Sequence, residues 1–188
     1  MTDGLRIRPL APDEFDRVWP IFREVIAGGD TYPYPDDLTL DQARAMWTSP
    51  PAQCFVAEAG DAVLGCYRIA PNMMGRGDHV ANGSYMVASA ACGRGIGAAL
   101  CEHSLAQARR SGFTAMQFNM VVSTNDAAVR LWQRMGFAIV ARIPGAFRHA
   151  ALGPVDTYVM HRTLQALPAA VSPAACGTAR SPAPSSAR

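Results

Sequence analysis

The 188-residue sequence has little charge and almost no imbalance between its signs. Asp, Glu, Lys and Arg make up 17% of the chain, and the formal net charge is +2. Arg109 and Arg110 form its one adjacent basic pair. Proteins that bind nucleic acid or an anionic membrane through charge carry clustered basic residues. The sequence therefore predicts no nucleic-acid partner and no membrane partner.

Long hydrophobic runs are missing as well. No apolar stretch reaches the length of about 20 residues that a membrane-spanning helix needs. The N-terminal segment, MTDGLRIRPL, lacks the apolar centre of a signal peptide. We therefore expect a cytoplasmic protein. Hydrophobic residues still make up 49% of the chain, which is enough to bury the core of one globular domain.

The cysteines also lack the spacing that is typical of a disulfide framework or a zinc site. The five cysteines are odd in number and scattered, and none forms a C-x-x-C pair. Disulfide frameworks and zinc sites use conserved, closely spaced sets of cysteine. Reduced and mostly buried thiols are the expectation, and no metal site is predicted.

What the sequence does contain is a glycine-rich stretch, Ser84–Ala98, at the junction of a strand and a helix. Strand-like Val80–Val87 leads into a loop with Gly93, Gly95 and Gly97, and an amphipathic helical pattern follows. Glycines at a helix start let backbone N–H groups approach a ligand closely, and the helix dipole attracts negative charge. The stretch predicts a phosphate-binding loop.

Three other interpretations of this loop compete. The spacing G-x-G-x-x-A, beginning at Gly93, fits a dinucleotide fingerprint, which expects an acidic residue about 20 positions later. The residues at 118–120 are Phe, Asn and Met. The expected acidic residue is therefore missing, and the dinucleotide interpretation loses support. A nucleotide-triphosphate loop ends in Gly-Lys-Ser/Thr. Two alanines follow Gly97 instead, which excludes a loop of this class. A plain structural turn is the third alternative and stays open.

A second motif, Ser123–Phe137, follows the strand-like run Ala115–Val122. Asn125 or Thr124 is placed to cap a helix, and Asp126 suits the first turn of that helix. Gly136 is typical of a helix end, so another strand is expected after it.

Together these two motifs resemble the GCN5-related N-acetyltransferase (GNAT) superfamily. That family's coenzyme A motif, Gln/Arg-x-x-Gly-x-Gly/Ala after a strand, reads CGRGIG from Cys92 to Gly97. Its later motif of Asn, an Ala-rich turn, Leu-Tyr and Gly-Phe is similar to the sequence from Asn125 to Phe137. Two motifs in this order, about 30 residues apart, are more specific than either alone. The resemblance covers roughly residues 5–164.

The resemblance implies the GNAT acyl-CoA N-acyltransferase fold, which is α+β. A mixed sheet of six or seven strands splays between strands 4 and 5 and is flanked by about four helices. We expect residues 4–165 to form this domain. Residues 166–188 are rich in Ala, Pro and Ser, and we expect them to be disordered because they bury too little apolar surface to offset their ordering entropy.

Local patterns predict the same order of elements. Strands are expected at 5–9, 53–59, 62–70, 79–87, 115–122, 138–143 and 156–162. Helices are expected at 13–27, from 39 to 47 or 48, after the glycine loop, and from 125 to the glycine at 136. Pro20 makes a kink or break in the first helix possible. Residues 144–154 are expected to form an irregular loop.

The resemblance implies acetyl-CoA as co-substrate, with its pantetheine arm between the strand that ends at Val87 and the strand that begins at Ala115. The Val87 N–H is expected to bind the oxyanion of a tetrahedral intermediate more tightly than the thioester carbonyl. The predicted cofactor-binding residues are Met86, Val87, Cys92, Gly93, Arg94, Gly95, Ile96, Gly97, Ala98, Asn125, Ala128 and Trp132.

Several positions depart from the family pattern. Cys92 stands where Gln or Arg is usual, so one phosphate contact is lost unless Arg94 replaces it. Trp132 stands where many members have a tyrosine that protonates the leaving thiolate. An indole N–H donates a hydrogen bond but is no useful acid, so core packing beside the cofactor is the favoured interpretation. Asn125 is interpreted both as a helix cap and as a ligand contact.

Two asparagines, Asn82 and Asn119, lie in otherwise apolar or small-residue strands on the two sides of the expected splay. A buried amide without a partner costs about 1–3 kcal/mol. They are expected to bond the open strand edge or to contact the acceptor, and the second interpretation is favoured. With Val87 and Asn125 they form the predicted catalytic set. The predicted substrate-binding residues are Tyr32, Tyr34, Asn82, Tyr85, Asn119, Phe147 and Arg148.

No general base stands out in the sequence. The acceptor ammonium must lose a proton before its nitrogen attacks. The candidate bases are His79, Tyr85, Tyr32 and Asp30.

One GNAT subgroup is similar in DTYPYP at 30–35, NGSYMV at 82–87 and FNxVxxTN at 118–125. It comprises enzymes related to the fungal acetyltransferase of azetidine-2-carboxylate and other proline analogues. The predicted function is direct acetyl transfer from acetyl-CoA to a small-molecule amine, such as an amino acid or analogue. The alternatives are a module that binds acyl-CoA without turnover, and an acyl-enzyme on Cys92 or Cys101. Many relatives pair through their sheets, so a homodimer is expected by analogy.

Overall fold

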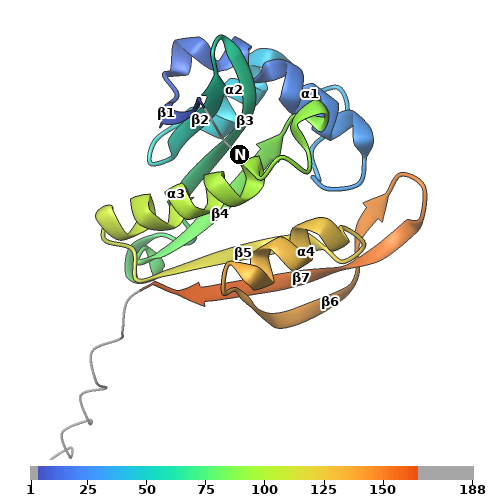
Figure 1. Ribbon diagram of the computed structural model, residues 1–188. Coiled ribbons are helices and arrows are strands. Elements are labelled where there is room, and N and C mark those ends of the chain that lie inside the picture. Colours follow the sequence, from blue (N-terminus) through green and yellow to red (C-terminus); the bar gives the residue numbers. More distant parts are fainter. Residues whose placement is uncertain (1–3, 165–188) are drawn as a thin grey trace, which may run out of the picture.

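A computed structural model describes residues 4–164 of the chain (Figure 1). Gln165, which ends the predicted domain, and the predicted tail at 166–188 lie outside the described residues.

Seven strands form one mixed sheet in the order β1-β2-β3-β4-β5-β7-β6. Their bounds are β1 Leu5–Pro9, β2 Gln53–Ala59, β3 Ala62–Pro71, β4 Val80–Val87, β5 Ala115–Val122, β6 Ala138–His149 and β7 Gly153–Thr163. Neighbouring strands pair antiparallel, except β4 and β5, which pair parallel. The predicted mixed α+β sheet is confirmed, and it has seven strands.

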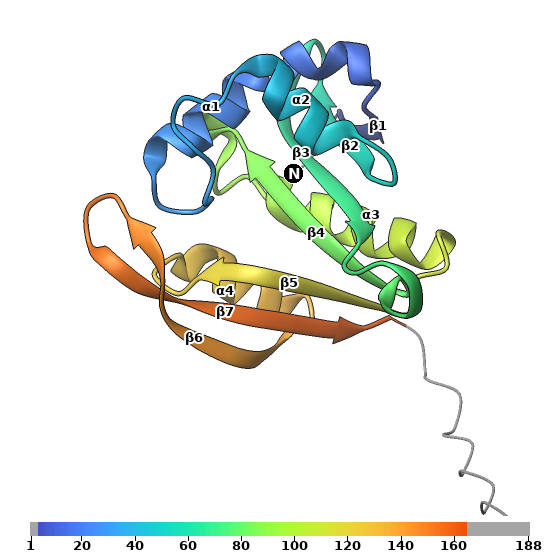
Figure 2. The same ribbon diagram turned by 180° about the vertical axis from the view of Figure 1, so that it is seen from behind.

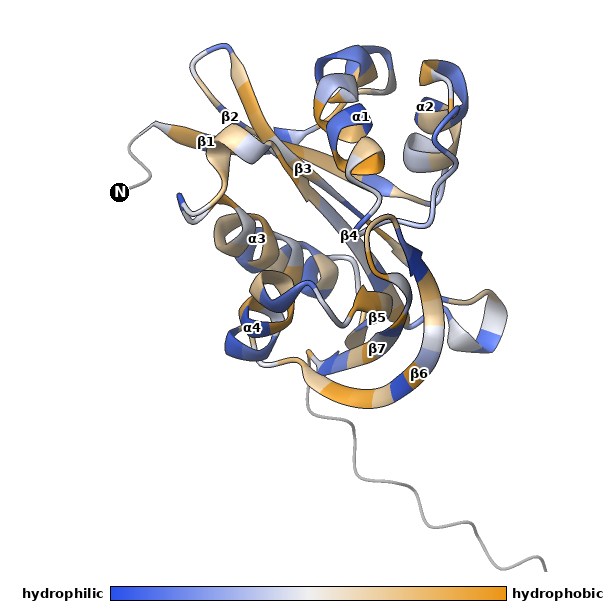
Figure 3. Cartoon of the chain, turned by 90° about the vertical axis from the view of Figure 1, so that its right-hand side faces the viewer, coloured by the Kyte–Doolittle hydropathy of each residue, from blue (hydrophilic) through white to orange (hydrophobic). Residues whose placement is uncertain are grey.

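Helices cover both faces of the sheet, with α1 and α2 on one face and α3 and α4 on the other (Figure 3). The helices are α1 Trp19–Gly28, α2 Leu40–Thr48, α3 Ile96–Arg110 and α4 Asp126–Arg134. Three short 3-10 turns are η1 Pro12–Arg17, η2 Gly75–Gly77 and η3 Ser89–Ala91. Each pair of helices buries its own apolar cluster against the sheet. This two-sided core holds the central strands in place.

The predicted helix at 13–27 is two elements, η1 and α1. Pro20 is the second residue of α1, where a backbone N–H has no intrahelical partner and its absence costs little. Proline therefore marks the start of the helix and does not kink its middle.

The prediction of an irregular loop at 144–154 is wrong. β6 extends to His149 and forms a hairpin with β7, and the pairing register shifts between Ile143 and Phe147. Pro144 and Gly145 lie in this shift, where a residue that cannot pair is tolerated. Gly145 has a φ of 58°, and its N–H donates to Asp156 Oδ1 at 2.8 Å.

Candidate active site

The two central strands separate soon after they pair. β4 and β5 pair over three residues each, Val80–Asn82 with Ala115–Gln117, and then diverge. Figure 2 shows them meeting at one end and opening into a V. Asn82 Nδ2 donates to the Gln117 carbonyl at 3.0 Å where the pairing ends. Beyond this point β4 has an open edge, as the predicted splay between strands 4 and 5 requires.

Tyr32, in the loop between α1 and α2, occupies part of this open edge. Its hydroxyl donates to the Tyr85 carbonyl at 2.7 Å and accepts the Tyr85 N–H at 2.9 Å. Buried backbone groups need partners, and here one side chain supplies what the missing strand does not. Burial also raises the pKa of the Tyr32 hydroxyl, so this phenol is a poor base near neutral pH.

Replacing Tyr32 by Phe is expected to lower the free energy of unfolding by about 2–4 kcal/mol, because it leaves both Tyr85 backbone groups without a partner. Tyr34→Phe is the matched control. Tyr34 stacks on Tyr32 at 5.3 Å between ring centroids, but its hydroxyl makes no hydrogen bond within residues 4–164. Urea denaturation of both variants measures the difference. Equal losses would contradict the role given to the Tyr32 hydroxyl.

The backbone N–H of Val87 points to the same open edge. Along an antiparallel strand, successive residues direct their N–H groups to alternate sides. The Ala88 N–H bonds to the Leu64 carbonyl on the β3 side, while the Tyr85 N–H bonds away from β3. Because the β3–β4 register has no shift, the Val87 N–H faces away from β3 and into the gap beside β5.

A cleft of about 380 Å³ lies between the diverging strands. Side chains from both sheet faces line it, so the cleft passes through the sheet. Its lining comprises Val25, Thr31, Tyr32, Pro33, Tyr34, Asn82, Gly83, Ser84, Tyr85, Met86, Val87, Cys92, Phe118, Asn119, Met120, Val121, Val122, Asn125, Ala128 and Trp132. Asp, Glu, Lys, Arg and His are absent from this lining, within the part of the chain that the structure describes.

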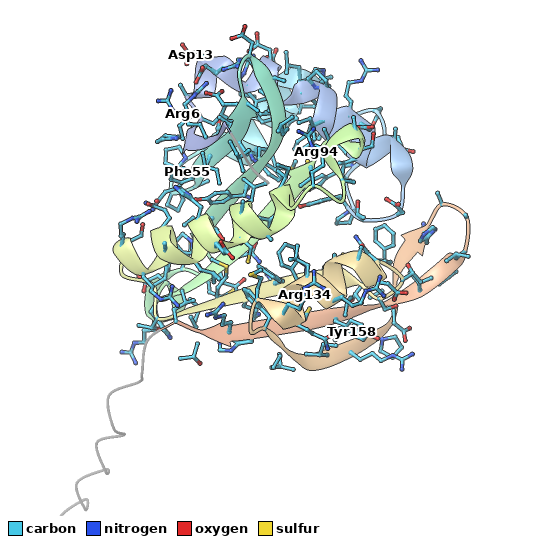
Figure 4. All side chains as sticks on the ribbon, in the orientation of Figure 1. Arg6, Asp13, Phe55, Arg94, Arg134 and Tyr158 are labelled. Carbon is cyan, nitrogen blue, oxygen red and sulfur yellow. The ribbon has the colours of Figure 1, made fainter. Side chains whose placement is uncertain are left out.

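The glycine loop joins the cleft to the start of α3. Gly93 and Gly95 have φ angles of 74° and 82°, which side-chain-bearing residues rarely adopt. A Cβ built on either glycine meets nothing within 4 Å, so the space above the loop is open. Arg94 belongs to this loop, between the two glycines, and its exposed side chain lies near the start of α3 (Figure 4).

The first turn of α3 begins beside this space, and within residues 4–164 its first backbone N–H groups have no partner. Gly95 caps α3 without a side-chain hydrogen bond, and the first N–H groups of a helix have no intrahelical partners. Ile96, Gly97 and Ala98 belong to this turn. Ile96 is buried, and a Cβ on Gly97 lies 3.2 Å from Leu131 of α4. The Gly97 position therefore also permits close packing of α3 against α4.

Asn125 and Trp132 bring α4 to the opposite side of the cleft. Asn125 Oδ1 accepts the Ala128 N–H at 3.1 Å and so caps α4, and the same residue lines the cleft. The Trp132 ring is buried, with its centroid 4.9 Å from those of Tyr85 and Phe118. Trp132 is thus both part of the core and part of the cleft wall.

Both predicted strand asparagines lie in the cleft lining, and both bond to protein groups. Asn82 bonds to the β5 backbone, as described above. Asn119 Nδ2 donates to Asn72 Oδ1 at 2.7 Å, and its Oδ1 accepts from Gln117 Nε2 at 2.8 Å. The Asn82 amide therefore bonds the edge of β5, whereas the Asn119 amide bonds side chains only, and contact of either with an acceptor stays a prediction.

The structure gives little support to the candidate bases. His79 and Asp30 are exposed, and neither lines the cleft. Tyr85 is in the lining, but burial holds the pKa of its hydroxyl well above the ordinary value. That hydroxyl is also 2.6 Å from Ser104 Oγ. Of the four candidates only Tyr32 and Tyr85 line the cleft, and neither is a ready base near neutral pH.

Two predicted substrate-binding residues do not line the cleft. Phe147 is buried in β6, and its neighbour Arg148 is exposed. They pair with Val155 and Pro154 of β7, and neither lines the cleft. A role for them in binding the acceptor stays a prediction without support from their position.

The two thiols considered as nucleophiles differ in position. Cys101 is fully buried in α3, and burial raises its pKa to about 12. A thiol with this pKa holds very little thiolate at neutral pH, so Cys101 is excluded as an acyl acceptor. Cys92 is exposed and lines the cleft. Its sulfur is 3.6 Å from the Ala88 carbonyl oxygen.

Some cleft residues were not predicted from the sequence, among them Ser84, Thr31 and Met120. Ser84 was predictable as a cleft residue. Every second side chain of a strand lies on the same face, and Ser84 lies between Asn82 and Met86, which were both predicted. Thr31 precedes the predicted Tyr32 in the same loop. Met120 lies in the stretch where the β5–β7 register shifts, and strand periodicity gives no guide there.

No helix within residues 4–164 is both long and apolar enough to cross a membrane.

Comparison with known proteins places these features in a family. The model of the acetyltransferase (GNAT) family matches residues 15–137. N-acetyltransferase aca1 of Schizosaccharomyces pombe is 32% identical over 148 residues, which cover 70% of this chain and 71% of that protein.

Solved structures give the same result. A GCN5-related N-acetyltransferase from Kribbella flavida has a TM-score of 0.82 and 43% identity, covering 87% of this chain and 99% of that one. A phosphinothricin acetyltransferase from Sinorhizobium meliloti, solved in complex with AcCoA, has a TM-score of 0.76 and 18% identity. The match covers 85% of this chain and 88% of that one, and at this identity it supports the fold alone.

Proposed function

This chain belongs to the acetyltransferase (GNAT) family, and from that premise we propose that it acetylates the amine of a small molecule with acetyl-CoA. As a family member the chain is an N-acetyltransferase. The finer proposal is that the acceptor is an amino acid or an analogue. The proposed acetyl transfer rests on one observation. A cleft passes through the sheet, and the backbone N–H of Val87 faces this cleft, away from β3.

Acetyl-CoA occupies the α3–α4 side in this proposal. The open space above Gly93 and Gly95 and the unpaired N–H groups at the start of α3 fit a diphosphate. Arg94 is exposed beside them and is free to add a charge. The remaining contacts that we assign to acetyl-CoA come from Met86, Val87, Cys92, Ile96, Gly97, Ala98, Asn125, Ala128 and Trp132.

When bound, acetyl-CoA supplies a thioester whose carbonyl carbon accepts a nucleophile. The Val87 N–H donates to the carbonyl oxygen and stabilises the negative charge that develops as nitrogen attacks. Collapse of the tetrahedral intermediate breaks the C–S bond. The thiol should have a pKa of about 8.5, like a free cysteine, so it leaves as thiolate and takes its proton from water. Trp132 donates at most a hydrogen bond there.

The acceptor enters from the α1–α2 side, where Tyr32, Tyr34, Asn82 and Asn119 line the cleft. Its ammonium loses a proton to water, because Asp, Glu, Lys and His are absent from the described lining. In this proposal the acceptor nitrogen attacks the thioester directly, without an acyl-enzyme. A small acceptor suits a cleft of about 380 Å³.

Release of the CoA thiol with a panel of amino acids, their analogues and polyamines tests this proposal. We expect turnover with one or more amino acids and saturable binding of acetyl-CoA by calorimetry. Binding of acetyl-CoA without thiol release from any amine would contradict the proposed reaction. Turnover confined to polyamines would contradict the proposed acceptor.

A cytoplasmic location and pairing of two copies also stay predictions. Fractionation of cells tests the first. Light scattering after size-exclusion chromatography tests the second.

A further inference from the structure

Arg68 of β3 is a partly buried cation without a charged partner. Its guanidinium carbon lies 5.9 Å from the centroid of the Trp47 ring. Its Nε is buried and makes no hydrogen bond within residues 4–164. The ion pairs of the described chain do not include Arg68 either. A buried polar group without a partner lowers stability, and contact with Trp47 offsets only part of that loss.

The position of Arg68 places this charge at the acceptor end of the cleft. Arg68 pairs with Ser84 across β3 and β4, so both side chains stand on the same face of the sheet. That face carries α1, α2 and the loop between them. Ser84, Tyr32 and Tyr34 form this wall of the cleft, and Arg68, which is not part of the lining, is the cross-strand neighbour of Ser84.

The Arg68 charge reaches both tyrosines of this wall. Burial raises the pKa of the Tyr32 and Tyr34 hydroxyls, and the positive charge of Arg68 opposes this rise at each of them. Because the cleft lining contains no Asp, Glu, Lys, Arg or His in the described chain, no charged lining residue opposes the positive field of Arg68 at this end. Charges act strongly where water is excluded.

We propose that Arg68 determines specificity by selecting acceptors that carry a free carboxylate, so that the substrates are amino acids and not their amides or polyamines. This inference rests on the proposed function and narrows its acceptor class. The field of a partly buried guanidinium favours an acceptor with a negative carboxylate over a neutral one, even where Arg68 itself does not line the cleft. A second ammonium on a polyamine is repelled by the same charge, and no acidic side chain in the described lining offsets that repulsion.

The test compares two acceptors that differ only at the carboxylate, the best amino acid of the panel and its primary amide. Wild type is expected to have the higher kcat/KM with the acid at equal concentrations of free amine. Arg68→Met is expected to lower kcat/KM for the acid about tenfold and to leave that for the amide within about twofold. The change in the ratio between variants is independent of the different amine pKa values of the two acceptors.

Two further variants separate charge from packing. Arg68→Lys keeps the charge and is expected to retain most of the preference for the acid. Arg44→Met, on α2, removes an arginine whose Nε is likewise buried without a hydrogen bond in the described chain but whose Nη1 pairs with Asp41 at 3.0 Å, so its charge is offset and neither value is expected to change. For the wild type, raising the salt concentration is expected to reduce the preference for the acid.

Several outcomes would overturn the inference. Equal losses for acid and amide in Arg68→Met mean that Arg68 only supports the packing of Trp47. A wild-type enzyme with no preference for the acid over the amide would also contradict the inference. If Arg68→Met does not fold, the preference for the acid is measured in Arg68→Lys and in wild type at rising salt. Loss of the preference in Arg68→Lys, or a preference that salt does not change, would contradict the inference. Turnover of the amide in wild type and variants keeps the proposed function valid even when the inference about Arg68 fails, whereas no turnover with any amine refutes the function itself.

Discussion

Val87→Pro is expected to lower kcat by about 100- to 1,000-fold, because it removes the backbone N–H that we assign to the developing oxyanion. Proline has no N–H but otherwise keeps an extended backbone. The Val87 N–H faces the open edge of β4 and takes no part in the ladder with β3, so its loss breaks no bond of the sheet. Proline is tolerated at such an edge.

Val87→Ala is the matched control. It shortens the side chain and keeps the N–H, so kcat is expected to stay within a few-fold of wild type. Both variants should bind acetyl-CoA with similar affinity, because the oxyanion contact strengthens mainly in the transition state. Steady-state kinetics, calorimetry and thermal melts measure these quantities. A Val87→Pro protein that folds and turns over like Val87→Ala would remove the proposed role of this amide.

Gly95→Asp is expected to raise the KM for acetyl-CoA about 10- to 100-fold relative to Gly95→Asn. Gly95 has a φ of 82° and caps α3 beside open space. Asn and Asp both tolerate this left-handed conformation, so the two variants carry similar backbone strain. Only Asp adds a negative charge where we place a diphosphate, and like charges at such short distance repel strongly.

Stability separates this effect from damage to the fold. A carboxylate at a helix N-terminus interacts favourably with the helix dipole, so Gly95→Asp should melt no lower than Gly95→Asn. The difference in KM should shrink at 1 M salt, where charges are screened within about 3 Å. Equal KM values for the two variants at low salt would contradict a diphosphate site at this helix start.

The sequence predicted elements that are encoded by neighbouring residues. The strand at 115–122 has the predicted bounds, and the capping box formed by Thr39 and Gln42 is present at the start of α2. The glycine loop and the cap at Asn125 are also where the motifs place them. These features depend on contacts within about four residues, which local patterns record.

Features that depend on distant residues were not predictable. Tyr32 was interpreted as a substrate or base residue, and its bond to a backbone 53 positions away leaves no periodic signal. The length of β6 was missed because Pro144 and Gly145 are usual strand breakers, yet a register shift with β7 accommodates them. The isolation of Arg68 depends on which side chains surround it in space, and the sequence alone does not give that.

The attachment of Tyr32 to β4 limits which positions of this enzyme can be substituted to change its acceptor specificity. The loop between α1 and α2 is anchored to the sheet by the hydroxyl that bonds to Tyr85, so position 32 is fixed by folding. The adjacent Thr31, Pro33 and Tyr34 also line the cleft without that constraint. Directed evolution of acceptor range should therefore accumulate substitutions at 31, 33 and 34 while selecting tyrosine at 32 in every surviving clone.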